Sequence, residues 1–318
     1  MSDQYLTLNR TNDKMPIVGF GCWKVEENTE EIVYTAIKNG YRLIDGAAVY
    51  DNEVGVGRGI NRAIKEGIVR REDLFVVSKL WNNYHNKAHV RPAIEKTLED
   101  MNLDYIDLYI VHFPVPLQYV DPAVQYPGPW KINGEVALEK SPMHELWPEM
   151  EKLVDAGLTR NIGISNFNCQ LIMDLLTYAK YKPATLQIEL HPYLQQEALV
   201  KWAQEQGIQV TAYSSFGPNS YFVFSEDVKS VPTLFDHDVI KSIAAKHNKT
   251  PAQVLLRWSI ERKVAVLPKS MNEERIKSNF DVFSFKLDEK DLQAIKKLDQ
   301  NLRFNSLFTY GINIPLFD

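Results

Sequence analysis

Residues 41–53 read YRLIDGAAVYDNE, and this stretch decides how the rest of the chain is interpreted. Its first four residues are typical of a short buried strand, which ends at Asp45. A turn of small residues leads to Tyr50, and a helical pattern begins near Glu53. Folds of alternating strands and helices build their active sites at the carboxyl ends of strands. An acid and a phenol at such a position indicate a candidate active site, although a strand cap beside a packed tyrosine would give the same pattern.

The same alternation of strand and helix runs through the chain. Short, β-branched, apolar segments predict strands buried on both faces at 17–21, 41–44, 74–78, 106–111, 159–164, 185–189, 209–212 and 264–267. Amphipathic segments predict helices at 29–38, 54–66, 88–101, 144–156, 170–178, 197–206, 238–247, 252–261 and 288–298. Thr250 followed by Pro251 is a helix start, because threonine caps well and proline suits the first turn.

Eight strands alternating with helices predict an α/β fold with a parallel sheet, and eight is the number that closes a (β/α)8 TIM barrel. Residues 5–17 are expected to form a hairpin over one end. A doubly wound open sheet is the alternative, but no G-x-G-x-x-G follows the first strand. No segment resembles a linker, so residues 1–318 are expected to form a single domain. The long connections 113–142 and 214–235 predict binding or gating loops at the carboxyl-terminal mouth.

The composition is that of an ordinary soluble protein. Of the 318 residues, 45% are hydrophobic and 24% charged, and the net charge is −5. This mild acidity gives no reason to expect nucleic acid or a membrane surface as a partner. Cys22 and Cys169 lie far apart and suggest neither a disulfide nor a metal site. No signal peptide or membrane span is visible, so we expect a cytoplasmic protein.

The strand ends place four reactive groups together. Lys79 ends an apolar strand, and a buried lysine needs a carboxylate partner, for which Asp45 is the obvious candidate. The ammonium is expected to lower the pKa of Tyr50 and so make the phenol a better acid toward a carbonyl. A neutral His112 would orient the same carbonyl by hydrogen bonding. A carbonyl reduced in this way needs a hydride from a cofactor.

Two further features are consistent with such a cofactor. Two cations, Lys269 and Arg275, lie with Ser270 and Asn279 between the last strand and a helix start, where phosphate would bind, although a solvated basic face would give the same pattern. Tyr213 at another strand end offers a flat surface for a nicotinamide ring, and its alternative is core packing. A Schiff-base role for Lys79 in a hydrolase or aldolase is disfavoured, because Asp45 would hold the lysine charged.

Longer stretches give a specific resemblance. They are GYRLIDGAAVYDNE, SKLWNNYH, LDYIDLYIVHFP, NIGISNF, LQIELHPYLQQ, TAYSSFGP, TPAQVLLRW and VLPKS. Together they resemble the aldo-keto reductases, and most of all the xylose (aldose) reductases of fungi, nearly from end to end. The resemblance implies a (β/α)8 barrel that binds NADPH across its carboxyl-terminal mouth and reduces aldehydes, with aldoses such as D-xylose as substrates.

The resemblance also implies roles for individual residues. Tyr50 would be the proton donor, Lys79 and Asp45 its partners, and His112 the residue that orients the carbonyl. The cofactor would be held by Ser165, Asn166, Gln187, Tyr213, Ser214, Phe216, Ser220, Lys269, Ser270, Arg275 and Asn279. The substrate would contact Trp23, Phe113 and Asn305, with Trp130 as a further member. No metal is implied.

Departures from the family pattern bear on specificity. Met271 stands where an asparagine commonly follows the Lys-Ser pair in reductases that also use NADH, so NADPH preference is expected and NADH use is doubtful. After LRFN the chain continues Ser306-Leu307, which alters one wall of the pocket. Other carbonyls therefore stay open as substrates: glyceraldehyde, erythrose, methylglyoxal and sugar acids. A non-catalytic NADPH-binding protein and a monomer or homodimer are also compatible with the resemblance.

Overall fold

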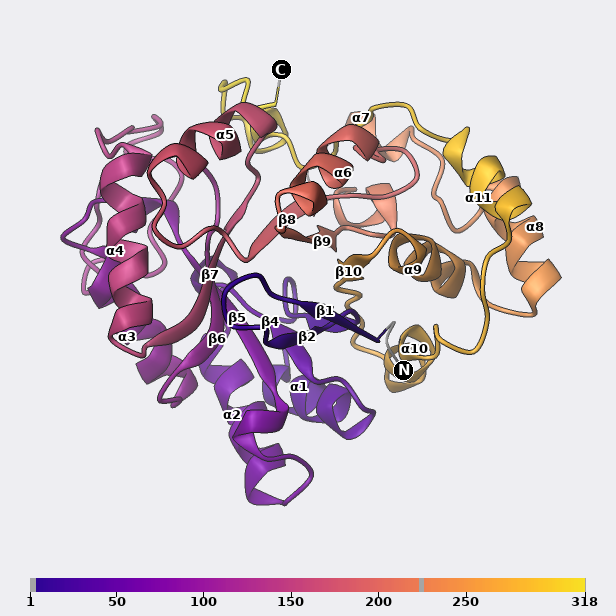
Figure 1. Ribbon diagram of the computed structural model, residues 1–318, viewed down its shortest axis with the longest axis horizontal. Coiled ribbons are helices and arrows are strands. Elements are labelled where there is room, and N and C mark those ends of the chain that lie inside the picture. Colours follow the sequence, from indigo (N-terminus) through magenta and orange to yellow (C-terminus); the bar gives the residue numbers. More distant parts are fainter. Residues whose placement is uncertain (1–3, 223–225, 318) are drawn as a thin grey trace.

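The computed structural model describes residues 4–222 and 226–317, and its centre is a sheet of eight parallel strands (Figure 1). Neighbours in the sequence are neighbours in the sheet, in the order β3 Gly19–Gly21, β4 Leu43–Asp45, β5 Phe75–Leu80, β6 Ile106–Val111, β7 Thr159–Ser165, β8 Thr185–Glu189, β9 Gln209–Tyr213 and β10 Val264–Val266. A parallel bridge between Val18 and Val266 joins the first strand to the last. The predicted barrel is therefore confirmed, and the open sheet is excluded.

Helices surround the strands on the outside, as Figure 1 shows. They are α1 Thr29–Lys38, α2 Glu53–Lys65, α3 Val90–Met101, α4 Met143–Asp155, α5 Cys169–Tyr178, α6 Glu197–Glu205, α7 Glu226–Lys229, α8 Asp238–His247, α9 Pro251–Glu261, α10 Glu273–Phe280 and α11 Glu289–Lys296. Thr250 caps α9 in a capping box with Gln253, as its sequence predicts. The short α7 was not predicted, because one turn of helix gives no periodicity.

The strands are buried on both faces, because the barrel interior lies on one side and the helices on the other. All six residues of β5 and all six of β6 are buried. Four strand ends were predicted too early, those of β4, β5, β7 and β9. β4 includes Asp45 and β9 includes Tyr213, so both side chains are held by the sheet itself. This fixes them more firmly than a loop would.

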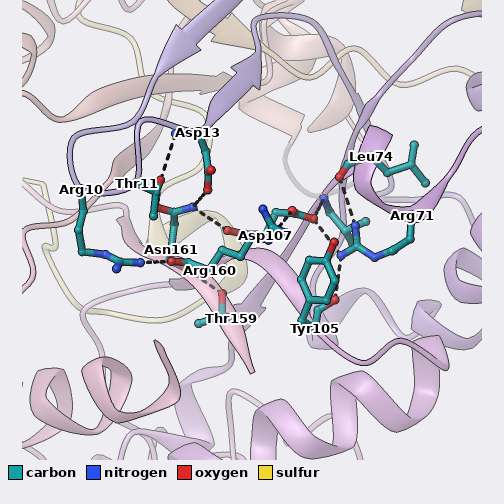
Figure 2. Close-up of polar contacts among 11 residues, drawn as sticks. Arg10, Thr11, Asp13, Arg71, Leu74, Tyr105, Asp107, Thr159, Arg160 and Asn161 are labelled. Carbon is teal, nitrogen blue, oxygen red and sulfur yellow. Dashed lines mark hydrogen bonds and ion pairs between the residues drawn. The ribbon is translucent and has the colours of Figure 1, made fainter. Parts of the chain in front are cut away.

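The amino-terminal end of the barrel is closed by the expected hairpin, β1 Tyr5–Thr7 with β2 Lys14–Pro16. Figure 2 shows how its loop is attached: the Asn161 amide accepts from Thr11 at 3.0 Å and donates to Asp13 at 2.9 Å. Asn161 also donates to the Asp107 carbonyl, and the Asp107 carboxylate accepts from Arg71 at 2.9 Å. This polar network occupies one end of the barrel and leaves the other end for a ligand.

The two long connections lie where they were expected. Residues 113–142 contain no regular helix or strand, but short bridges join Leu117 to Leu138 and Ile132 to Glu135. The second connection carries a 3-10 turn, η5 Gly217–Ser220, and α7. Within the described part of the chain, no helix has the length and apolar character to cross a membrane.

Candidate active site

The carboxyl ends of β4 and β5 hold a buried ion pair. The Lys79 ammonium donates to Asp45 Oδ1 at 2.6 Å and to the Gly46 carbonyl at 2.7 Å. The Lys79 side chain is 0% exposed and that of Asp45 5%, so neither charge is solvated. Gln187, from β8, donates to the other Asp45 oxygen at 2.7 Å. The predicted pairing is confirmed, and each carboxylate oxygen has a donor, as a buried charge requires.

Tyr50 lies on the 3-10 turn η2 Ala48–Tyr50, which follows β4. The segment is anchored by Asn52, which donates to the carbonyls of Cys22 and Val25 at 2.9 Å each. The Lys79 ammonium is 4.9 Å from the centroid of the Tyr50 ring. Both ends of the turn are thus fixed, and the ring lies beside the ion pair.

The expected lowering of the Tyr50 pKa is wrong. Burial raises the Tyr50 pKa well above its usual value, and the negative charge of Asp45 raises it further. The positive charge of Lys79 does not outweigh these two effects on the Tyr50 pKa, because Asp45 binds its ammonium at 2.6 Å. The phenol is therefore fully protonated at neutral pH, which is the state that a proton donor needs.

His112 follows β6 and is fixed by its backbone N–H, which donates to Leu80 at 3.1 Å. Its ring packs edge-on against Trp81, at 5.3 Å between centroids, and against Tyr50 at 5.8 Å. Burial, together with the charge of Lys79, lowers the His112 pKa well below its usual value. The imidazole is neutral at physiological pH, as the sequence predicted, and can donate one hydrogen bond.

These groups surround a cavity of about 450 Å³ at the mouth of the barrel. From the predicted set, the cavity wall includes Trp23, Asp45, Tyr50, His112, Phe113, Trp130, Asn166, Gln187, Tyr213, Ser214, Phe216, Lys269 and Asn305. Lys79 lies behind the wall, in contact with Asp45. Residues predicted from seven different strand ends, two long loops and the carboxyl-terminal tail are therefore brought together in one space.

The predicted nicotinamide residues form a connected group. Tyr213 lines the cavity and donates its hydroxyl proton to Asn166 Oδ1 at 2.6 Å. Asn166 adopts a left-handed backbone, with φ of 64°, and its amide donates to the His112 carbonyl at 2.8 Å. Ser165 lies further back, 1% exposed, and donates to the Gln187 carbonyl. Asn166, Gln187 and Tyr213 are thus at the surface of the cavity, with Ser165 supporting them.

The predicted phosphate residues lie at the far side, around the start of α10. Lys269 is half-buried at the cavity wall, while burial and the charge of Arg275 lower its pKa. Ser270 accepts from the Asn272 backbone, and Asn272 caps α10 through the N–H of Arg275 at 3.0 Å. Asn279 is buried on the same helix. The side chain of Ser220, also predicted here, lies outside the described part of the structure.

Several wall residues escaped the sequence analysis. Lys24 lies in the cavity wall, and its pKa is lowered by burial and by the charge of Lys269. Trp81, Asn219, Tyr221 and Tyr310 also line the space. Trp81 was within reach of prediction, because it directly follows a strand; Tyr310 lies in the tail, where no pattern indicated a site.

Comparison with known proteins identifies the family. The sequence profile described as "Aldo/keto reductase family" matches residues 18–300, which is most of the chain. The chain belongs to the aldo/keto reductase family. It is an oxidoreductase by that membership, and the resemblance seen in the sequence is confirmed.

Several relatives match over their whole length. A 4-dihydromethyl-trisporate dehydrogenase from Mucor mucedo is 60% identical over 321 residues, and a probable NAD(P)H-dependent D-xylose reductase from Emericella nidulans is 57% identical over 320, with 100% of each chain covered in both cases. Among solved structures, the aldose reductase of Schistosoma japonicum superimposes with a TM-score of 0.86 at 38% identity, covering 97% of each chain. The structural match and the family match therefore assign the chain to the same kind of protein.

A buried carboxyl group behind the site gives a pH-dependent prediction. Glu53, 4% exposed, accepts from Ser78 at 2.5 Å and from Thr97 at 3.1 Å. Burial raises its pKa from 4.5 to about 7, against the effect of these hydroxyls. The pKa of Glu53 is higher in the folded protein than in the unfolded chain, so protonated Glu53 favours the folded state. This contribution to the free energy of unfolding is complete below the unfolded pKa and is lost as pH rises through about 7.

We therefore expect Glu53→Gln to gain stability over the wild type as pH rises from 5 to 8, by about 2 kcal/mol across that range. Urea unfolding at both pH values measures this difference. Glu27→Gln, at an exposed position, is the matched control and should show no such trend. A constant difference between Glu53→Gln and the wild type at both pH values would contradict the raised pKa.

Proposed function

We propose that the protein reduces aldehydes with NADPH, and that aldoses such as D-xylose, reduced to xylitol, are its substrates. The observation that carries this proposal is the pairing, on one cavity wall, of a protonated phenol and a neutral imidazole, Tyr50 and His112, with the Lys79–Asp45 pair behind them. The probable D-xylose reductase of Emericella nidulans and the D-xylose reductase of Aspergillus niger, at 57% and 54% identity, support the same substrate class.

The residues have separate tasks in this reaction. NADPH, when bound, supplies the hydride that attacks the carbonyl carbon. His112 donates a hydrogen bond to the carbonyl oxygen and so orients it. Tyr50 gives its hydroxyl proton to that oxygen as negative charge develops there. The phenolate that remains lies 4.9 Å, measured to the ring centroid, from the Lys79 ammonium, which stabilises it.

The residues present fit NADPH along the length of the cavity. The space is continuous from Tyr50, past Tyr213 and Phe216, to Lys269, so an extended dinucleotide has a single path. Asn166 and Gln187 lie beside Tyr213, where an amide would meet the nicotinamide carboxamide. At the far end, Lys269, Arg275 and Lys24 would neutralise phosphate groups. Ser214, Ser220, Ser270 and Asn279 complete the proposed set.

Preference for NADPH over NADH rests on the same end of the cavity. Lys269 and Arg275 offer two cations to a 2′-phosphate, whereas Met271, 44% exposed, offers no hydrogen bond to the ribose hydroxyls of NADH. We expect the double variant Lys269→Met with Arg275→Ala to raise KM for NADPH by about 100-fold, since each charge-assisted hydrogen bond contributes about 1.5–3 kcal/mol. KM for NADH should change by less than about threefold. Steady-state kinetics with both cofactors measures this, and equal effects on the two would show that these residues do not bind the 2′-phosphate.

A second candidate substrate follows from the relatives and the cavity wall. The Mucor mucedo relative, at 60% identity, is a 4-dihydromethyl-trisporate dehydrogenase, so an alcohol of that kind is an alternative substrate for the reverse reaction. The wall is rich in aromatic rings, among them Trp23, Trp81, Phe113 and Trp130, which would suit a less polar molecule than a sugar. Both candidates use the same hydride chemistry.

The decisive experiment is a substrate panel. We would measure kcat/KM with NADPH and with NADH for D-xylose, L-arabinose, DL-glyceraldehyde, methylglyoxal and D-galacturonate, and identify the sugar alcohol formed. The proposal predicts efficient turnover of the two pentoses with NADPH. Turnover of only the short or acidic carbonyls would replace the aldose assignment, and lack of turnover of every aldehyde would support a non-catalytic NADPH-binding role. Borohydride trapping should give no covalent adduct with Lys79, because its buried nitrogen is bound to Asp45.

A further inference from the structure

A chain of hydrogen bonds connects the carboxyl-terminal tail with the centre of the site. Tyr310, on the 3-10 turn η6 Leu307–Tyr310, donates to Asn305 Oδ1 at 2.7 Å. Asn305 Nδ2 donates to the Tyr213 hydroxyl at 2.8 Å, and Tyr213 donates to Asn166 Oδ1 at 2.6 Å. Asn166 Nδ2 ends the chain at the His112 carbonyl, at 2.8 Å. Tyr310, Asn305, Tyr213 and Asn166 all line the cavity.

The direction of every bond in this chain follows from its last member. The His112 carbonyl can only accept, so the Asn166 amide nitrogen must face it and the Asn166 oxygen must face Tyr213. Tyr213 therefore donates its only proton to Asn166 and can only accept from Asn305. The Asn305 nitrogen is thereby fixed on Tyr213, and the Asn305 oxygen is left facing Tyr310.

The backbone of Asn305 is fixed independently. The buried carboxylate of Glu189, 0% exposed at the end of β8, accepts the backbone N–H groups of Phe304 and Asn305 at 2.8 Å each. Tyr310 is itself held at the wall, because its ring lies nearly parallel to that of Trp130, with 6.5 Å between centroids and 11° between planes. Asn305 therefore has a fixed position, and Tyr310 determines what its carbonyl oxygen contacts.

We propose that Tyr310 is a specificity-determining residue, which fills one of the two acceptor positions of the Asn305 carbonyl oxygen and so weakens the binding of aldehydes rich in hydroxyl groups. A substrate hydroxyl must donate its proton to be satisfied in a closed site, and the Asn305 oxygen is an acceptor in the wall beside Tyr50 and His112. With Tyr310 bound to that oxygen, Asn305 offers substrate one acceptor position in place of two, together with its remaining N–H. The inference rests on the proposed carbonyl reduction and names the substrate feature that this site discriminates.

The test is Tyr310→Phe, which removes one hydroxyl and keeps the ring against Trp130. With saturating NADPH, KM for D-xylose and for DL-glyceraldehyde should fall by about 3-fold to 10-fold, which corresponds to one hydrogen bond gained by substrate. KM for butanal, which carries no hydroxyl, should stay within about twofold. Tyr178→Phe, which removes the hydroxyl of a tyrosine on α5 outside the cavity, is the matched control and should change neither value.

The outcomes separate this inference from the proposed function. A fall in KM that is confined to the hydroxylated aldehydes supports the role of Tyr310. An unchanged or higher KM for them, or an equal change with butanal, overturns it. If the wild type reduces butanal and glyceraldehyde but not D-xylose, the aldose assignment fails, while the comparison of glyceraldehyde with butanal still decides the role of Tyr310.

Discussion

Replacing Tyr50 with phenylalanine is expected to lower kcat for aldehyde reduction by about 10²–10⁴-fold, the range that a positioned general acid provides. The hydroxyl is the proton source for the developing alkoxide, and the high pKa of Tyr50 keeps that proton in place at neutral pH. The ring itself stays beside Lys79, so the cavity keeps its shape. The binding of NADPH, followed by quenching of protein fluorescence, should therefore change by less than about twofold.

Steady-state kcat for Tyr50→Phe and the wild type, each normalised to the NADPH-binding fraction, measures this effect. His112→Ala should lower kcat as well, but through loss of carbonyl orientation, so its KM for aldehyde should also rise. Retention of more than a tenth of wild-type kcat by Tyr50→Phe would show that another group supplies the proton.

Replacing Lys79 with methionine is expected to affect both stability and activity. The variant leaves the Asp45 carboxylate buried without its ammonium partner, although Gln187 still donates to it at 2.7 Å. Removing one member of a buried pair costs about 3–5 kcal/mol of unfolding free energy. Urea unfolding at pH 7 measures the loss of stability, and steady-state kinetics measures the loss of activity.

A second variant separates the two roles of Lys79. In Lys79→Met with Asp45→Asn, no unpaired charge is left, so stability should return to within about 1–2 kcal/mol of the wild type. Activity should stay low, because the phenolate of Tyr50 has lost the cation 4.9 Å from its ring. If the double variant regained wild-type kcat, the ion pair would be a structural feature only.

The sequence predicts most of the architecture because each strand and most helices of the barrel show a local pattern of apolar residues. The apolar periodicity of the sequence predicts every barrel strand, and the cost of burying an unpaired lysine predicts Asp45 as the partner of Lys79. The pKa of Tyr50 could not be predicted correctly. The direction of the pKa shift depends on how deeply the Tyr50 ring is buried and on the distance between Lys79 and Asp45. Neither quantity can be inferred from the order of residues along the chain.

The cavity wall was predicted only in part, for a related reason. Trp23 and Phe113 follow strands directly, so their place at the mouth could be inferred from topology. Tyr310 and Tyr221 come from the tail and the long loop after β9, whose course over the barrel is set by tertiary contacts such as Glu189 with Asn305. Lys24 was not predicted as a cavity residue, because a single lysine after a strand belongs to no periodic pattern.

The most direct measurement is the fate of the hydride. The purified protein would be incubated with D-xylose and NADPH that carries deuterium at the transferred position, in ordinary water, and the alcohol product analysed by mass spectrometry and NMR. We expect one deuterium at the former carbonyl carbon, with NADPH consumed in equal amount to the alcohol formed. Xylitol without deuterium, or NADPH binding without turnover of any aldehyde, would contradict it.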